Sequence, residues 1–160
     1  SKRSTYGKRG FWNSKNFKYF EIELTNYFAN RDVAFIWNNI SKIGNDDRGK
    51  PADQIEKLER DYFNVFLCEF KILKPDVVIF TTGKSRDSFI KHHFGGGVAF
   101  LPKLSLSDGS LESKTLNLLA EVKLPSFDAV KAVRLEHPSR RSLSKAISLH
   151  VIKDLIESEE

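Results

Sequence analysis

The chain has 160 residues, of which 40% are hydrophobic and 29% charged, and this composition is typical of one ordinary globular domain. No run approaches the roughly 20 consecutive apolar residues of a membrane helix, and no short apolar run behind a basic N-terminus predicts a secretory signal. Cysteine occurs once, at Cys68, which excludes an internal disulfide and a cysteine metal cage. These features favour a cytoplasmic protein, and we expect no membrane partner, no metal and no cofactor.

Lysine and arginine total 26 against 21 acids, which gives a net charge of +5. A surplus of this sign favours partners that carry phosphates, because binding them releases counterions. The basic residues stand out at the front of the chain and directly after a His-Pro-Ser turn, where they are Lys2, Arg3, Lys8, Arg9, Arg140 and Arg141. A nucleic acid is therefore a plausible partner.

The first part of the chain predicts a lead-in, a helix and a strand. Residues 1–14 are polar and basic without periodicity and predict a flexible lead-in, so we expect a single domain over 15–160. Apolar side chains at helical spacing predict an amphipathic helix over about 15–29. The β-branched and aromatic run 33–37 predicts a buried strand, and a polar loop rich in turn formers spans 44–51.

The middle of the chain predicts a long helix, a strand and a short helix. A stripe of apolar side chains predicts a helix over about 52–73, which Pro75 ends. Residues 76–80 predict a second buried strand, and 85–93 predict a short helix after it.

The last part of the chain is harder to interpret. Residues 98–101 suit a short strand, 111–122 a helix and 129–135 a last strand, and a C-terminal helix follows over about 143–155. Strands that alternate with helices predict an α/β fold, here a three-layer α/β/α sandwich with a mainly parallel central sheet.

In such sheets ligands bind outside the carboxyl ends of the strands. That rule selects the turns at residues 38–42, 81–84 and 136–141, and we expect all three to lie on one edge of the sheet. They are rich in amide, hydroxyl, imidazole and cationic groups. The sequence therefore predicts a binding site at this edge.

Asn38 and Asn39 follow the predicted first strand, where an amide can hold a planar ring with one donor and one acceptor. Asparagine also caps turns and helices, and this second interpretation stays open. The turn at 81–84 continues into Gly-Lys-Ser, but a phosphate-binding loop needs a further glycine where Val78 stands. A nucleoside triphosphatase is therefore not expected.

His137 begins the His-Pro-Ser turn after the last predicted strand. Pro138 stiffens the turn and pushes His137 toward extended geometry, so the imidazole is held at the strand end. A histidine placed there can donate a hydrogen bond to a developing anion. Arg140 and Arg141 can bind phosphates, and Ser139 can cap the next turn or contact a phosphate itself.

Three features together resemble the uracil-DNA glycosylase superfamily. They are the strand ending Ile36-Trp37-Asn38, the run 73–80 (Leu-Lys-Pro-Asp-Val-Val-Ile-Phe) with Gly83, and the strand-terminal His137-Pro138-Ser139. In that family an asparagine at a strand end reads the uracil edge, and a His-Pro-Ser loop enters the DNA minor groove. The resemblance covers roughly residues 33–155.

The resemblance implies that Asn38 or Asn39 recognises a flipped base and that His137 stabilises the departing uracil anion. It implies that the segment from Ser139 to Arg141 grips the DNA backbone. Phe11 is a candidate for the aromatic ring that stacks on the base, with Trp12 as the alternative. Lys42, in the first of the three turns, is a further candidate for DNA binding.

One family feature has no counterpart in the sequence. The family's first motif supplies a water-activating Asp or Asn, and residues 1–10 contain no acid. Either preceding residues carry that motif or the protein lacks it.

The leading hypothesis is a monomeric uracil-DNA glycosylase-like protein that recognises or excises a flipped, damaged or deaminated base by hydrolysis of the N-glycosidic bond. The alternative is a non-catalytic nucleic-acid-binding or protein-interaction domain that uses the same sheet edge.

Overall fold

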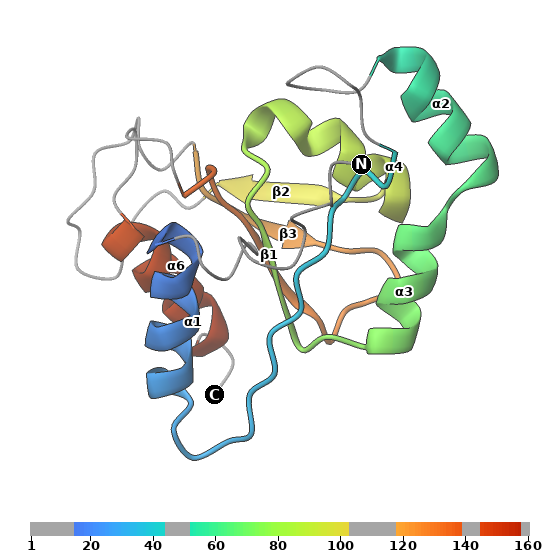
Figure 1. Ribbon diagram of the computed structural model, residues 1–160. Helices are drawn as coiled ribbons and strands as arrows, with labels where there is room; N and C mark the ends of the chain where they lie inside the picture. Colours follow the sequence, from blue (N-terminus) through green and yellow to red (C-terminus); the bar gives the residue numbers. More distant parts are fainter. Residues whose placement is uncertain (1–14, 44–51, 103–117, 139–144, 158–160) are drawn as a thin grey trace, which may run out of the picture.

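The computed structural model describes residues 15–43, 52–102, 118–138 and 145–157 (Figure 1). They form a mixed α/β fold with a four-stranded sheet and five helices. The helices are α1 (Lys15–Tyr27), α2 (Asp53–Tyr62), α3 (Val65–Leu73), α4 (Asp87–Phe94), preceded by the 3₁₀ turn η2 (Lys84–Arg86), and α6 (Lys145–Glu157). The strands are β1 (Val77–Phe80), β2 (Ala99–Pro102), β3 (Ala120–Lys123) and β4 (Lys131–Arg134). Within the described ranges no helix has the length and apolar character needed to span a membrane.

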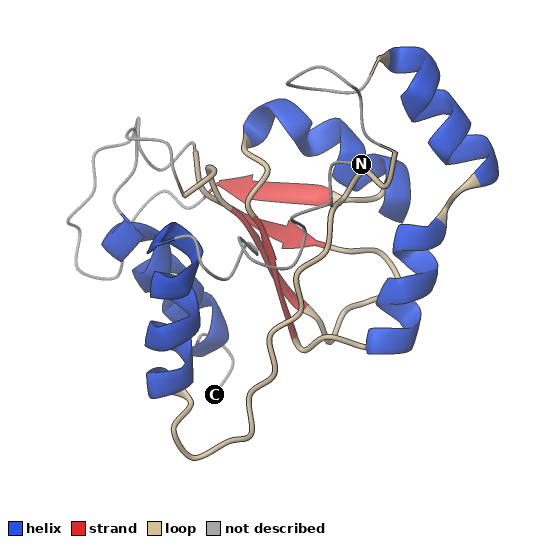
Figure 2. Cartoon of the chain, in the orientation of Figure 1, coloured by secondary structure: helices blue, strands red, loops and turns tan. Residues whose placement is uncertain are grey.

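The strands of the sheet lie in the order β1-β4-β3-β2. Figure 2 shows the sheet in red with helices on either side of it. β1 and β4 are parallel, and β3 is antiparallel to both of its neighbours. Residues 124–130 join β3 to β4, and such a link is too short for the crossover of a dozen or more residues that parallel neighbours need. The sheet is therefore mixed, and the expectation of a mainly parallel sheet is not confirmed.

Two hydrophobic clusters lie on opposite faces of this sheet. Ile79 and Val133 pack in the cluster that holds side chains of α1 and α6. Their neighbours Val78 and Ala132 pack in the cluster that holds side chains of α3 and α4. Because successive strand residues point to opposite faces, the helix pair α1 and α6 covers one face and the pair α3 and α4 the other (Figure 1).

Helices α1 and α6 run in the same direction. Near their beginnings the Lys145 ammonium lies 5.6 Å from the centre of the Tyr19 ring, and near their ends the Lys153 ammonium lies 5.0 Å from the Tyr27 ring. The first residues of both helices, Lys15 among them, therefore lie at the same end of the pair.

Several predicted elements are confirmed, and one predicted helix is divided. The helix at 15–29, the strands at 76–80, 98–101 and 129–135, the helix at 85–93 and the C-terminal helix correspond to α1, β1, β2, β4, α4 and α6. The long helix predicted over 52–73 is broken into α2 and α3 at Phe63, whose φ of −136° leaves the helical region.

Two predictions are wrong. Residues 33–37 form no strand, because among the described strands β1 pairs with β4 alone and no described strand pairs with this run. Ile36 and Trp37 are 61% and 41% exposed. Phe35 is the residue of this run that packs in a hydrophobic cluster. A helix is predicted over 111–122, but the described part of this range contains the strand Ala120–Lys123. Residues 120, 122 and 124 are buried in alternation, which is the period of a strand. Residues 111–117 lie outside the described part of the chain.

Candidate functional site

The turns after β1 and β4 are joined by backbone hydrogen bonds. Leu135 N–H donates to the Phe80 carbonyl at 2.8 Å, and Gly83 N–H donates to the Leu135 carbonyl at 2.9 Å. The parallel ladder thus continues past the end of both strands. Of the three predicted turns, 81–84 and the described part of 136–141, residues 136–138, lie side by side at the carboxyl edge, as expected.

Gly83 and Glu136 form a close contact between these turns. Gly83 has φ +70° and ψ 164°, a region open to glycine alone in practice. A Cβ added there would lie 2.9 Å from Glu136 Oε1, so the glycine lets the carboxylate rest against the backbone. Glu136 is only 6% exposed. The hydroxyl oxygen of Thr82, the residue before Gly83, is buried without a hydrogen-bond partner among the described residues.

Glu136 was not identified from the sequence as a site residue. The signal that could have found it is an acid at the end of the apolar run of the last strand, where burial of a carboxylate is costly and needs a reason.

His137 belongs to a group of three aromatic rings, which we call the aromatic triad. Its ring lies 5.4 Å from that of Phe17 at 86°, and Phe17 lies 5.5 Å from Trp37 at 59°. Both arrangements are edge-to-face or tilted, as aromatic pairs prefer. Phe17 is 8% exposed, whereas Trp37 is 41% exposed and His137 is exposed. The triad joins α1, the segment 32–39 and the end of β4, which no local sequence pattern connects.

The third predicted turn is held by helices α2 and α3. Asn38 Nδ2 donates to Glu69 Oε2 at 2.8 Å, and the Lys42 ammonium donates to both Asn38 Oδ1 and Glu69. The Lys42 hydrogen bond, with that of Asn38, holds the pKa of Glu69 below its usual value. Both polar ends of the Asn38 amide are therefore engaged within the protein, while Asn39 is exposed.

The same turn is tied to α2 and α4 through two buried polar side chains. Glu59 is 4% exposed and accepts hydrogen bonds from Ser41 Oγ at 2.7 Å and from Lys42 N–H at 2.5 Å. His93 is 5% exposed, and its Nε2 lies 2.7 Å from the Ile40 carbonyl, so Nε2 carries the proton and donates it. Burial lowers the pKa of His93, so the ring is neutral at pH 7.

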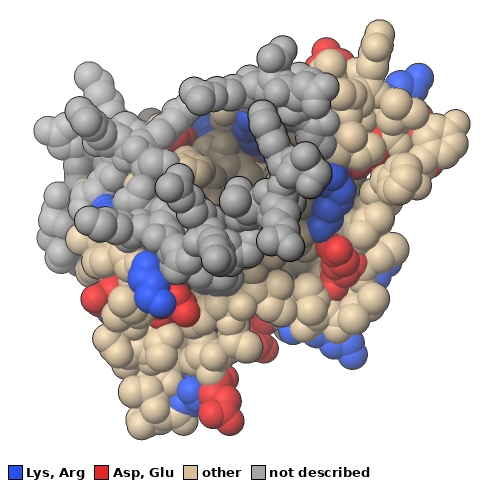
Figure 3. Space-filling view, in the orientation of Figure 1, with Lys and Arg blue, Asp and Glu red and all other residues tan. Residues whose placement is uncertain are grey.

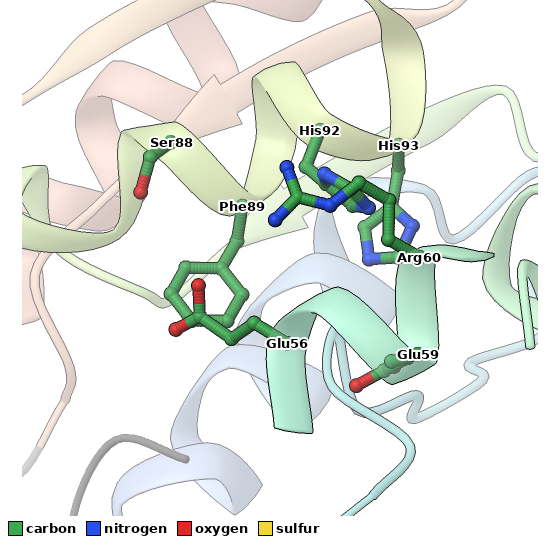
Figure 4. A pocket seen from close by; sticks show the side chains of 7 residues that line it. All are labelled: Glu56, Glu59, Arg60, Ser88, Phe89, His92 and His93. Carbon is green, nitrogen blue, oxygen red and sulfur yellow. The ribbon is translucent and has the colours of Figure 1, made fainter. Parts of the chain in front are cut away.

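A small pocket of about 80 Å³ lies between α2 and α4. Figure 4 shows the side chains that line it, which are Glu56, Glu59, Arg60, Ser88, Phe89, His92 and His93. The carboxylates and the guanidinium come from α2 and the imidazoles from α4. Within the described ranges no group of three or more His, Cys, Asp or Glu side chains could hold a metal ion.

Four predicted site residues lie outside the described part of the chain, namely Phe11, Ser139, Arg140 and Arg141. Residues 1–14 and 139–144 together contain six basic residues and no acid, so they carry a charge of +6. The net charge of the whole chain is +5, so the rest of the chain carries −1. On the face shown in Figure 3, basic and acidic side chains of the described residues are interspersed. The positive surplus therefore belongs to the two segments that join the structure before Lys15 and after Pro138.

Comparisons with protein-family models, with curated proteins and with solved structures found no match to this chain.

Proposed function

We propose that the chain is a uracil-DNA glycosylase-like protein that binds DNA and takes a flipped base at the joined ends of β1 and β4. The observation that carries the proposal is the position of His137. It is exposed at the end of β4, beside the β1 turn, and its ring contacts Phe17. We further propose that the chain has the three-layer α/β/α arrangement of that family and that it acts as a monomer in the cytoplasm.

The reaction is hydrolysis of the N-glycosidic bond. The oxygen of a water molecule forms a bond to C1′ of the deoxyribose while the bond from C1′ to the base nitrogen breaks, and the base leaves with the electron pair. An imidazole N–H of His137 donates a hydrogen bond to the departing anion. The water loses a proton, and Glu136 is the carboxylate that this edge offers as its acceptor.

The remaining predicted residues have supporting roles in this proposal. Ser139, Arg140 and Arg141 follow Pro138 directly and bind phosphates of the DNA backbone. Asn39 is exposed and reads the base edge, and Asn38 can do so once its amide leaves Lys42 and Glu69.

The direct test is a gel assay on an oligonucleotide with one uracil, followed by alkaline cleavage of the abasic product. We expect cleavage with the wild-type chain and a loss of about 10²- to 10³-fold in rate for His137→Ala, the usual effect of removing one donor to a developing anion. His150→Ala is the matched control, because His150 is exposed on α6. An absence of abasic product with the wild-type chain would overturn the enzymatic proposal.

A second candidate is a non-catalytic domain that binds nucleic acid or a protein. An exposed apolar groove favours it, lined by Ile36, Trp37, Asn38, Glu69, Ile72 and Leu73, in which Ile36 and Ile72 are 61% and 78% exposed. Salt-sensitive DNA binding without excision would support the nucleic-acid version. Absence of DNA binding would support a protein partner.

A further inference from the structure

We propose that the pocket between α2 and α4 binds a small zwitterionic amino acid, with its ammonium group on Glu59 and His93 and its carboxylate on Arg60. The proposal goes beyond the proposed function, because none of the residues that line the pocket belongs to the joined turns after β1 and β4. It adds a second binding site and the chemical class of its ligand.

The imidazole of His93 carries the first step. The ring is 5% exposed and lines the pocket. Its Nε2 donates to the Ile40 carbonyl at 2.7 Å, and burial lowers the pKa of His93, so the ring is neutral and Nδ1 is an acceptor. Nδ1 is buried and has no hydrogen-bond partner among the described residues. Because an unpaired buried acceptor costs free energy, this nitrogen favours a ligand that brings an N–H or O–H donor.

The carboxylate of Glu59 adds a negative charge to the same pocket. Glu59 is 4% exposed, and its oxygens accept hydrogen bonds from Ser41 Oγ at 2.7 Å and from Lys42 N–H at 2.5 Å. Both donors are neutral groups, and Glu59 forms no ion pair within the described part of the chain. A carboxylate has room for about four hydrogen bonds, so each oxygen can accept another one. A buried carboxylate without a cation favours a ligand with a positive charge.

The guanidinium of Arg60 supplies the opposite charge. Arg60 is exposed and makes no hydrogen bond or ion pair with the described residues. After burial, its charge is the largest cause that lowers the pKa of His92, which places the guanidinium close to that ring. Figure 4 shows the Arg60 side chain next to the two imidazoles. A guanidinium binds a carboxylate through two parallel hydrogen bonds, so the pocket offers a place for each charged group of a zwitterion.

The size of the pocket limits the side chain of the ligand. One water-sized group needs about 10–15 Å³ of such space, so the volume of about 80 Å³ takes about five to eight non-hydrogen atoms. Glycine, alanine and serine fall within this range. A simple anion or a simple amine would fit, but it would satisfy only one end of the pocket.

An occupied pocket would also steady the turn at residues 38–42. Glu59 accepts from Ser41 and Lys42 of this turn, and His93 donates to its Ile40 carbonyl. A ligand that pairs with Glu59 and His93 therefore joins α2 and α4 to the turn through the same two side chains. We expect the ligand to slow hydrogen exchange of the Lys42 amide, which donates to Glu59.

The experiment titrates the full chain, labelled with ¹⁵N-histidine, with glycine. Comparison with His93→Gln assigns the imidazole signal of His93. We expect a saturable change in the Nδ1 shift with a dissociation constant on the order of 1 mM, the scale of a very small ligand. Acetate lacks the ammonium group, methylammonium lacks the carboxylate, and trimethylglycine lacks an N–H donor. Each should bind about 10- to 100-fold more weakly than glycine, the effect of losing hydrogen bonds to a charged group.

Two variants test the carboxylate end of the pocket. Arg60→Gln should weaken glycine binding about 10- to 100-fold. Lys57→Gln is the matched control and should bind as the wild type does, because Lys57 is an exposed cation on the same helix that does not line the pocket. Far-UV circular dichroism checks that both variants are folded.

Three results would overturn the proposal: no saturable change of the His93 signal with glycine, equal affinity for glycine and acetate, or unchanged affinity in Arg60→Gln. Glycine binding without slower exchange of the Lys42 amide would overturn the link to the turn. Uracil excision is measured separately and does not enter any of these results, so the proposed function stands or falls independently.

Discussion

Gly83→Ala tests the contact that brings the β1 and β4 turns together. The substitution has two costs. The backbone at φ +70° and ψ 164° is a region in which a side chain costs about 1–3 kcal/mol. The new Cβ would also lie 2.9 Å from Glu136 Oε1, 3.2 Å from Oε2 and 3.3 Å from Cδ. Because Glu136 is 6% exposed, its carboxylate must move within packed surroundings, and overpacking of this kind costs about 1–3 kcal/mol.

The two costs can be separated by a double-mutant cycle. In the wild-type background we expect Gly83→Ala to lower the free energy of unfolding by about 2–6 kcal/mol, the sum of both effects. In a Glu136→Ala background the steric contact is gone, so the same substitution should cost only the backbone share, about 1–3 kcal/mol. Urea unfolding followed by tryptophan fluorescence and circular dichroism measures all four free energies.

Gly96→Ala is the control for this cycle, because a Cβ at Gly96 would have no neighbour within 4 Å. Its free energy of unfolding should stay within about 1 kcal/mol of the wild type. A Gly83→Ala chain as stable as wild type would refute the reasoning about Gly83 altogether. An equal loss in both backgrounds would refute the role of Glu136.

Three further predictions concern stability. The Ile152 side chain is 0% exposed between α6 and the sheet, so Ile152→Ala should lower the free energy of unfolding in urea by about 2–5 kcal/mol. Ile72 is 78% exposed, so Ile72→Ala should lower it little. Similar losses for the two variants would contradict the assigned core. Arg134 is 2% exposed and its Nε lies 3.1 Å from Asp87 Oδ1. Arg134→Ala should therefore lower the free energy of unfolding by about 3–5 kcal/mol, and by less in an Asp87→Asn background. Strictly additive losses for the two substitutions would exclude the ion pair. Burial lowers the pKa of His93, so the unfolded chain takes up a proton near pH 6.5 before the folded one does, and stability should fall as the pH drops below about 6.5. His93→Gln should flatten that slope, while an unchanged slope would assign it elsewhere. Burial raises the pKa of Asp87, so at lower pH the folded chain takes up that proton before the unfolded one does. This group therefore raises the stability as the pH falls, which is opposite to the effect of His93.

Local patterns in the sequence determined most of the elements. Apolar spacing of 3.6 residues marks α1 and α6, and short β-branched runs mark β1 and β4. The position of His137 at the end of β4, next to the turn after β1, also followed from the sequence, because parallel strands place their carboxyl ends on one edge.

The tertiary structure alone decided the direction of β3, the exposure of residues 33–37 and the partners of the site residues. Strand direction depends on which neighbour the chain reaches, and the short link 124–130 makes β3 antiparallel to β4. A β-branched run such as 33–37 becomes a strand only when a neighbouring edge supplies hydrogen bonds, and here none of the described strands does. His137 meets Phe17, which in turn holds Trp37, across more than a hundred residues of sequence. Contacts between side chains so far apart in sequence come from the packing of α1 and the segment 32–39 around the sheet edge, which no local periodicity encodes.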